Sequence, residues 1–285
     1  MASLRQIRGR MRSISNIHEI TKAMGMIAAF RFKKAENRFS RARNYFVEME
    51  SVVADLAGSA EGLDHPLFEH REPKRKALVV MTGDKGLCGA YNANLLRAAG
   101  QWFERNQGTE NYVVPVAKVG YDFFKKKRRP ILLAYPEKAS VDLALAKHIT
   151  EDLKGLYLES KIDSVEVLHT SYRAGAAGTI RLGTFLGLRH LISGEKKGGE
   201  NFFIFEPDFG SVFIALLTRY LEGKMYLTLL ESLTSELGAR MIAMKQATEN
   251  ADEVLDSLRL LRNKTRQATI TRELSEIVGG ANVLA

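Results

Sequence analysis

The sequence predicts an α/β chain in which two long terminal helices flank an inserted domain of Rossmann-like type. Three observations support this class. All six prolines lie between Pro66 and Pro207, and a proline costs about 3 kcal/mol inside a helix. The two proline-free flanks repeat apolar residues in alternating steps of three and four, which is the seam of a coiled coil. The middle alternates short β-like runs with helical ones, which predicts a mainly parallel sheet covered by helices.

The first flank, residues 1–58, is predicted to be one helix. The second half has a regular seam formed by Ala35, Phe39, Ala42, Phe46, Met49, Val53 and Leu56. The first half is less regular, and its apolar residues are Leu4, Ile7, Met11, Ile14, Ile17 and Ile20. The last two of these add an extra step of three, and an insertion of that kind changes a supercoil locally.

Residues 66–207 form the predicted α/β domain. The expected strands are Ala77–Thr82, Tyr112–Lys118, Ile131–Ala134 and Val165–His169. The expected helices between them are Asn92–Arg105, Tyr121–Lys126 and Val141–Glu159. The last flank, residues 209–285, is predicted to be the second long helix. Its seam is Met244, Ala247, Ala251, Val254, Leu258, Leu261, Thr265 and Ala268.

The first expected strand runs into a glycine-rich turn, "GDKGLCG" at 83–89, followed by a helix. A strand, a glycine loop and a helix can cradle a phosphate. However, Lys85 precedes the second glycine, which does not fit a Walker loop, and the even glycine spacing does not fit the dinucleotide fingerprint. The glycines therefore indicate a tight turn more than a nucleotide site. No His or Asn is visibly placed to activate Cys88, and the six histidines lack metal-ligand spacing.

The composition is that of an ordinary globular protein with a formal net charge of +9, which favours acidic partners. The charge is uneven, because residues 1–45 hold eleven Lys or Arg and only two Glu. Five further basic residues follow one another at 125–129, where cations are favourable at a helix C-terminus. A single cysteine suits a reducing compartment. No apolar run reaches the ~20 residues that span a bilayer.

Three segments resemble one family. "ITKAMGMIAA" at 20–29, "GDKGLCGAYNANL" at 83–95 and "RNKTRQATITRELSEIVGGA" at 262–281 are similar to the γ subunit of F-type ATP synthases. The resemblance implies an antiparallel coiled coil that turns inside a ring of α and β subunits and stands on a membrane c ring. It implies mechanical coupling between proton flow and the catalytic β subunits, with no catalytic residue, cofactor or metal in this chain. The ε subunit is a further implied partner.

The resemblance also implies which residues contact partners. Those matching family contacts to the β subunit are Lys22, Met24, Lys85, Cys88, Arg240, Gln267, Thr271 and Glu273. Phe203 and Glu206, in "FIFEP" at 203–207, match a stretch that faces the c ring. Gly83 and two phenylalanines replace the family's usual serine and tyrosines, which puts contacts through those hydroxyls in doubt. The implied location is peripheral, on the cytoplasmic side of the cell membrane, and the early start of the rod motif favours a bacterial enzyme.

The residues alone leave two other functional classes possible. A nucleotide-binding α/β protein with coiled-coil arms would bind ATP by itself. A coiled-coil nucleic-acid binder would show strong salt dependence, although few aromatic residues lie among the N-terminal basic ones.

Helix geometry gives a last prediction. If the chain leaves one helix near residue 58 and enters the other near 209, facing residues have numbers that add to about 267, given equal rise in both helices. Residues 265–285 then have no partner in their own chain. They carry Ala268, Ile270, Leu274, Ile277 and Val278, an apolar set that another protein is expected to cover. Gly279 and Gly280 are expected to end the helix.

Overall fold

The computed structural model describes residues 3–57, 65–69, 71–136, 141–173, 178–187, 205–206 and 208–284, with side chains as far as residue 278. The chain divides into two units. One consists of residues 1–30 and 240–285, and the other of residues 31–239. Both long helices pass from one unit into the other, so each unit contains a stretch of both.

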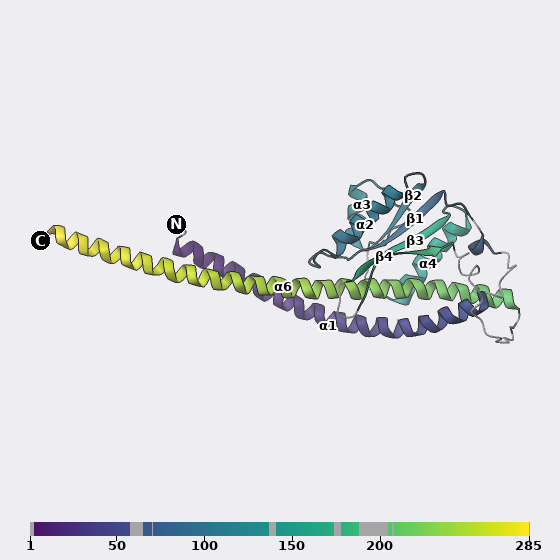
Figure 1. Cartoon of the computed structure of the whole chain (residues 1–285), viewed down its shortest axis with the longest axis horizontal. Coiled ribbons are helices and arrows are strands. Elements are labelled where there is room, and N and C mark those ends of the chain that lie inside the picture. The colour runs from purple at the N-terminus through teal and green to yellow at the C-terminus, as the bar shows by residue number, and fades with distance from the viewer. Residues whose placement is uncertain are drawn as a thin grey trace. The chain divides into compact units, whose positions relative to one another are not determined.

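The two predicted long helices are present (Figure 1). Helix α1 spans Leu4–Ala57 and helix α6 spans Phe209–Leu284. Asp208 caps the start of α6, because its carboxylate accepts hydrogen bonds from the backbone N–H and the hydroxyl of Ser211. The prediction that Gly279 and Gly280 end the helix is wrong, since α6 continues to Leu284. A glycine inside a helix costs only about 1 kcal/mol relative to alanine, so it does not force an end.

A mixed four-stranded sheet lies in the unit of residues 31–239. Its strands are β1 (Arg75–Met81), β2 (Glu110–Val116), β3 (Ser164–Ser171) and β4 (Thr179–Leu186), in the order β2-β1-β3-β4. β1 pairs in parallel with β2 and β3, and β3 pairs antiparallel with β4. The expected strand at 131–134 is reduced to isolated bridges at Ile131 and Tyr135. β4 was not predicted, because six of its eight residues are exposed and form no apolar run.

The described residues of this unit also form the shorter helices η1 (Pro66–Phe68), α2 (Tyr91–Arg105), α3 (Lys118–Lys126) and α4 (Leu143–Leu158). Alternate residues of the strands enter two separate cores. Val79 and Met81 join the core formed with α1, α4 and α6, whereas Leu78 and Val80 join the core formed with α2 and α3. The sheet is therefore covered on both faces, as Figure 1 shows.

Within the unit of residues 31–239, the seam of α1 follows the predicted residues. Ala35, Phe39, Phe46, Val53 and Leu56 are all buried. Phe46 stacks on Tyr220 of α6 with 5.3 Å between ring centroids. Gly223 lies beside the same ring, because a Cβ atom there would stand 3.4 Å from Phe46. This part of the helix pair is closely packed.

Within the unit of residues 1–30 and 240–285, the seam of α1 differs from the prediction. Ile17 and Ile20 are 47% and 58% exposed, whereas His18, Thr21 and Gly25 are partly buried. The extra three-residue step is therefore absent, and the period of three and four continues through polar and small residues. The seam of α6 also differs from the prediction. The predicted seam residue Val254 is exposed, and the next residue, Leu255, is buried in its place.

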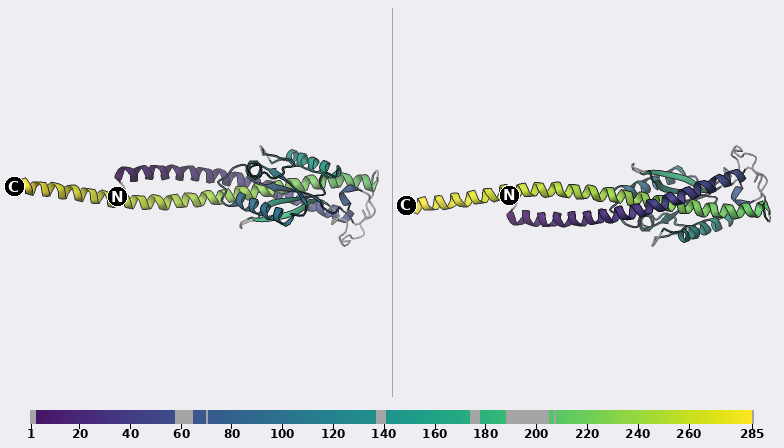
Figure 2. Two further views of the ribbon diagram at one scale, coloured as in Figure 1. Left: turned by 90° about the horizontal axis from the view of Figure 1, so that it is seen from above. Right: turned by 90° about the horizontal axis from the view of Figure 1, so that it is seen from below.

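The register of the two helices is the same in both units. Thr21 faces Thr248 and Phe46 faces Gly223, so the numbers of facing residues add to 269. His18 faces Asp252, and Phe32 faces Gly238, which gives 270. The helices are antiparallel, within three residues of the predicted register. In Figure 2, α6 consequently continues past the first turn of α1.

Candidate functional site

The glycine loop at 83–89 is closed by hydrogen bonds with Asn92 of α2. The backbone N–H of Gly83 donates to Oδ1 of Asn92 at 2.9 Å. The side-chain amide of Asn92 in turn donates to the carbonyl of Lys85 and lies 3.3 Å from Sγ of Cys88. A Cβ atom on Gly83 would stand 2.8 Å from Cδ of Glu236. The loop therefore serves as a turn packed against α6, and the N–H of Gly83 is already occupied.

The exposed part of this loop is its tip. Lys85 and Gly86 are exposed, and Leu87 is 60% exposed with a positive φ of 62°. Cys88, by contrast, is 2% exposed and belongs to the core under α2. The contact of Cys88 with a partner stays a prediction, and the side chain itself is buried in the free chain. The residues that the loop presents outward are its neighbours.

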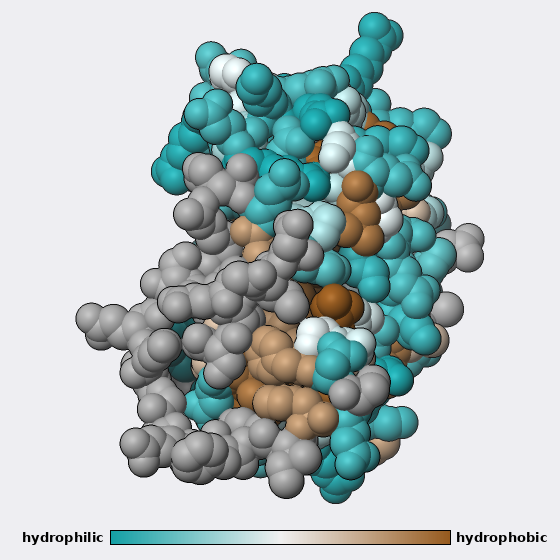
Figure 3. Space-filling view, turned by 90° about the vertical axis from the view of Figure 1, so that its right-hand side faces the viewer, coloured by the Kyte–Doolittle hydropathy of each residue, from teal (hydrophilic) through white to brown (hydrophobic). Residues whose placement is uncertain are grey.

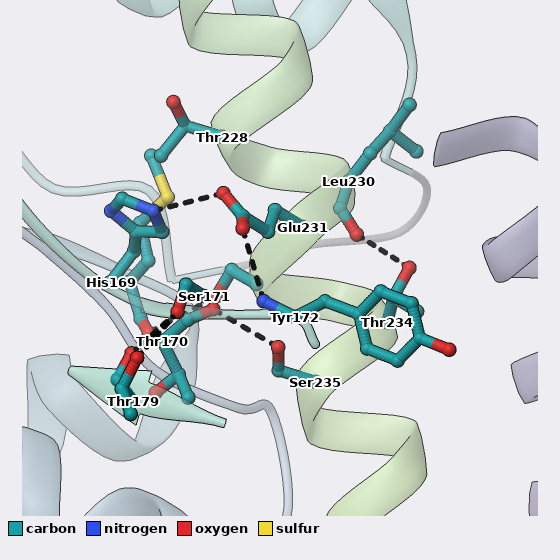
Figure 4. Close-up of polar contacts among 12 residues, drawn as sticks. His169, Thr170, Ser171, Tyr172, Thr179, Thr228, Leu230, Glu231, Thr234 and Ser235 are labelled. Carbon is teal, nitrogen blue, oxygen red and sulfur yellow. Dashed lines mark hydrogen bonds and ion pairs between the residues drawn. The ribbon is translucent and has the colours of Figure 1, made fainter. Parts of the chain in front are cut away.

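A polar cluster at the end of β3 connects the sheet to α6 (Figure 4). His169 Nε2 lies 3.1 Å from Oε2 of Glu231 on α6, and Oε1 of Glu231 accepts the backbone N–H of Tyr172. The carbonyl of Thr170 accepts the hydroxyl of Ser235. The sequence does not predict this cluster, because its members are spread over the chain and share no motif.

The predicted rod contacts lie at different depths. Lys22 is exposed, whereas Met24 and Arg240 are partly buried. Next to Lys22 on α1, five apolar side chains are exposed, namely Ile17, Ile20, Met26, Ile27 and Phe30, the last at 74%. α1 therefore presents basic and apolar side chains together over this stretch.

The end of α6 carries the other predicted contacts. Gln267, Thr271 and Glu273 are exposed, and the Thr271 hydroxyl donates to the carbonyl of Gln267 within the helix. The apolar residues Ile270, Leu274, Ile277 and Val278 are exposed as well. The prediction that this segment lacks a partner in its own chain holds for these residues.

The opposite end of the pair, where α1 ends and α6 begins, is aromatic. Phe209 stacks on Phe213 with 5.5 Å between centroids, and Phe213 stacks on Phe68. Figure 3 views this end and shows apolar side chains at its surface. Glu206 is exposed there. Phe203, the other predicted c-ring contact, lies outside the described residues.

The described residues offer no cluster of three or more His, Cys, Asp or Glu side chains suited to a metal ion. Among the same residues, no helix is both long and apolar enough to cross a membrane. The candidate functional surfaces among the described residues are the exposed rod faces, the tip of α6 and the tip of the glycine loop.

Known proteins resemble the chain along its whole length. A family model described as ATP synthase matches residues 3–284. The ATP synthase gamma chain of Mycolicibacterium gilvum is 37% identical over 307 residues, covering 100% of this chain and 98% of the relative. The gamma chain of Heliobacterium modesticaldum is 36% identical over 291 residues and is covered completely.

Two solved structures share the fold. A chain in the structure of the Tetrahymena thermophila mitochondrial ATP synthase central stalk and c ring superposes with a TM-score of 0.63 at 23% identity, over 80% of this chain and 99% of that one. A chain of the Euglena gracilis mitochondrial enzyme superposes with a TM-score of 0.71 at 14% identity, over 99% and 94%. With the sequence relatives, which are similar from end to end, the assignment is direct: this chain belongs to the ATP synthase gamma chain family.

Proposed function

We propose that the chain is the central rotor shaft of an F-type ATP synthase. It couples proton-driven rotation of a membrane c ring to ATP synthesis and hydrolysis at the catalytic β subunits, and it forms no covalent bond itself. The proposed partners are the α and β subunits of the catalytic ring, the ε subunit and the c ring. The chain reaches the membrane only through these partners.

The observation that carries this proposal is the end of α6. In the 269–270 register, residues beyond about 266 have no counterpart on α1 at the equal rise of two helices. Their side chains Ile270, Leu274, Ile277 and Val278 are exposed. Apolar groups that are contiguous and unpaired indicate a surface that another protein covers. An apolar bearing formed by the α and β subunits would cover this tip.

The backbone chemistry of the rod suits rotation. A helix satisfies its own backbone hydrogen bonds, whereas a free strand edge invites pairing with any partner. The exposed cations of α1, including Arg5, Arg8, Arg12 and Lys22, would meet an acidic segment of each β subunit in turn. Such contacts are weak one by one at exposed sites, at about 0–1 kcal/mol each. Weak repeated contacts let the rotor leave each position.

We propose individual contacts for the residues that match contact positions of the family. Lys22, Met24, Lys85 and Arg240 would face the β subunits along the rod, and Gln267, Thr271 and Glu273 would do so near the tip. Glu206, exposed at the start of α6, would face the c ring. Lys85→Cys in a Cys88→Ser background should crosslink to a β subunit in the assembled complex. Labelling only by solvent reagents would remove the glycine loop from the contact surface.

The test of function is reconstitution. Cognate α and β subunits are mixed with and without the full chain, and steady ATP hydrolysis is measured after size exclusion. We expect the chain to co-elute with both subunits and the steady rate to require it. A chain that stays separate from α and β, or a rate that does not respond to it, contradicts the proposal.

A further inference from the structure

Helix α3 ends in five consecutive cations that the proposed function does not use. Lys125 and Lys126 are its last two residues, and Lys127, Arg128 and Arg129 follow them. All five side chains are exposed. α3 packs with α2 on one face of the sheet, whereas α4 and the long helices form the core on the other (Figure 1). This basic run, residues 125–129, therefore belongs to the surface of the α/β domain.

No carboxylate of the described residues neutralises the basic run. None of its five side chains forms an ion pair among them, and Asp122, the acidic residue nearest in sequence, is exposed and does not pair with the run either. Elsewhere in the same unit, Arg75 lies 2.8 Å from Asp163. Like charges that lie together destabilise the folded chain. The favourable effect of the helix dipole acts only within the last turn, so it does not account for the whole run.

Aromatic rings hold the two ends of the basic run. Nζ of Lys125 lies 5.5 Å from the ring centroid of Tyr121, and Cζ of Arg129 lies 4.6 Å from that of Phe103 on α2. The negative face of a ring attracts a cation without neutralising it. Both end residues are therefore held in place and still carry their full charge.

Arg128 occupies a backbone position that usually belongs to glycine. Its φ of 52° lies in the left-handed region. The N–H of Arg128 donates to the carbonyl of Lys125, and the N–H of Arg129 donates to that of Phe124, which is the Schellman end of a helix with Arg128 at the glycine position. A Cβ atom makes this conformation costly, and strained positions of this kind cluster at functional sites. The chain thus keeps a cation where glycine would fit with less strain.

We propose that the basic run is a docking site for an acidic segment of a partner protein, in which several Asp or Glu side chains lie close together. The exposed, unpaired positive charge of the run is complementary to such a segment. Clusters of basic residues that include arginine recognise acidic motifs through charge-assisted hydrogen bonds. The site is a property of the free chain, so it does not depend on the rotor assignment.

Other occupants fit these observations less well. A second copy of this chain carries the same net charge of +9 and the same run, so the two would repel each other. Single-stranded nucleic acid stacks on exposed aromatic rings, but Phe103 and Phe124 beside the run are buried. A membrane-binding helix presents large apolar side chains together with its cations, and no residue of α3 is among the exposed large apolar ones.

Carbodiimide coupling to the full chain tests the site, with an acetylated hexaglutamate peptide as the probe. The reagent joins a carboxylate to a lysine only where the two are in contact, and mass spectrometry identifies each coupled lysine. Lys125–Lys127 therefore report on the basic run separately from the lysines of α1. The test variant is Arg128→Gln/Arg129→Gln, which leaves these three lysines in place. The matched control is Arg97→Gln/Arg173→Gln, at two exposed arginines of the same unit.

We expect the peptide to couple to the basic run several times faster than to Lys147, an exposed lysine of α4. The excess should vanish in about 1 M salt, where the Debye length is about 3 Å. Loss of the two arginines should slow coupling at the run by roughly fivefold, the effect of two exposed ion pairs, while the control keeps the parent rate. Arg128→Gly should also slow coupling, yet keep or raise the melting temperature, because glycine suits the left-handed backbone.

Coupling at the run that is no faster than at Lys147, or an equal loss in the control variant, overturns the proposal. A lower melting temperature for Arg128→Gly would show that this side chain stabilises the fold, and would likewise contradict it. Binding to phosphatidylglycerol vesicles and to oligothymidylate is measured on the same variants. A larger loss there than for the peptide would assign the run to lipid or nucleic acid and reject a protein partner. Reconstitution with α and β subunits is measured separately on the parent chain, so failure of the rotor assignment leaves this result standing.

Discussion

The hydroxyl of Tyr172 donates a 2.6 Å hydrogen bond to Oε1 of Glu36 on α1, while the backbone N–H of the same residue donates to Glu231 on α6. One residue at the end of β3 thus connects the sheet to both long helices. Burial first, and then the Glu36 carboxylate, raise the pKa of Tyr172 to about 12. The tyrosine remains a neutral donor at any physiological pH.

Tyr172→Phe should lower the free energy of unfolding by about 1.5–3 kcal/mol, the range for a hydrogen bond to a charged group. The ring contacts with Phe32 and Phe39, 5.8 and 5.9 Å between centroids, are kept. Urea unfolding measures the change. The matched control is Tyr45→Phe, at an exposed ring, which should cost less than about 0.5 kcal/mol. Equal losses in the two variants would show that the Glu36 contact contributes nothing specific.

Asp163 should make stability depend on acid pH. Burial raises the pKa of its carboxyl, but the hydrogen bonds from the Arg75 side chain and from the N–H groups of Arg75 and Lys74 lower it further, so the net shift is down from 3.8. A lowered folded-state pKa means that the unfolded chain binds the proton more readily. The stabilisation is therefore complete above pH 4 and is lost as the pH falls through the folded-state pKa.

Asp163→Asn should cost about 1.5–3 kcal/mol at neutral pH, and the difference from the parent should shrink towards pH 3. Urea unfolding across this range measures both. Asp122→Asn, at an exposed carboxylate of α3, is the control and should show a small difference that does not vary in this way. A pH-independent difference for Asp163→Asn would contradict the linkage.

Replacement by alanine should change the free energy of unfolding in opposite directions at two helical glycines. A Cβ atom on Gly120 would stand 2.9 Å from Oγ1 of Thr82, a buried hydroxyl that accepts the N–H of Gly120 and donates to Val116. Gly120→Ala should therefore destabilise by about 1–3 kcal/mol, the usual cost of overpacking. Gly100 in α2 has nothing within 4 Å of that position. Gly100→Ala should stabilise by about 0.4–1 kcal/mol through the unfolded state. Thermal unfolding of both variants measures these changes. A shift of the melting temperature in the same direction in both variants would contradict the steric argument.

Truncation after Thr269 should leave the free chain almost as stable as before. No residue from 259 to 278 is fully buried, and those from 270 to 278 are all exposed. The melting temperature should move by no more than about 2 °C, since 1 kcal/mol corresponds to roughly 2–4 °C in domains of this size. Binding to the α and β subunits should weaken. A large drop in the melting temperature would show that the tip folds onto its own chain.

Lys22→Glu should separate folding from function. The side chain is exposed, so the free energy of unfolding should change by less than about 0.5 kcal/mol. Reversal of the charge should nevertheless impair ATP-driven proton pumping in the assembled enzyme. Unaltered pumping would take Lys22 off the list of contacts. Arg240 is a less clean choice, because it is partly buried and a change there is expected to affect folding as well.

The helices were predictable because proline placement and the heptad repeat act over tens of residues. Near the N-terminus, the period of three and four predicts the seam better than the apolar character of single residues does. Extending the regular seam of Ala35 and Phe39 backwards in steps of seven leads to Thr21 and Gly25, and to His18. Those are the residues that the structure buries in part. The period was the better guide, because polar side chains can occupy a seam when they pair across it.

The candidate contacts were less predictable for a different reason. Burial of Cys88 depends on Asn92 and on the core under α2, which no local pattern reveals. The Tyr172 cluster joins residues up to 136 positions apart in the chain, so its geometry exists only after folding. β4 carries too few buried residues to give a strand signal. Long-range packing decides each of these features.

The central claim is that this chain turns inside a ring of α and β subunits. The direct measurement fixes those subunits to a surface and attaches a bead to the chain through Lys126→Cys, at an exposed residue of α3, with Cys88→Ser preventing a second site. On addition of ATP, we predict continuous rotation of the bead in one direction. A bead that keeps a fixed angle while the bound complex hydrolyses ATP would contradict the claim.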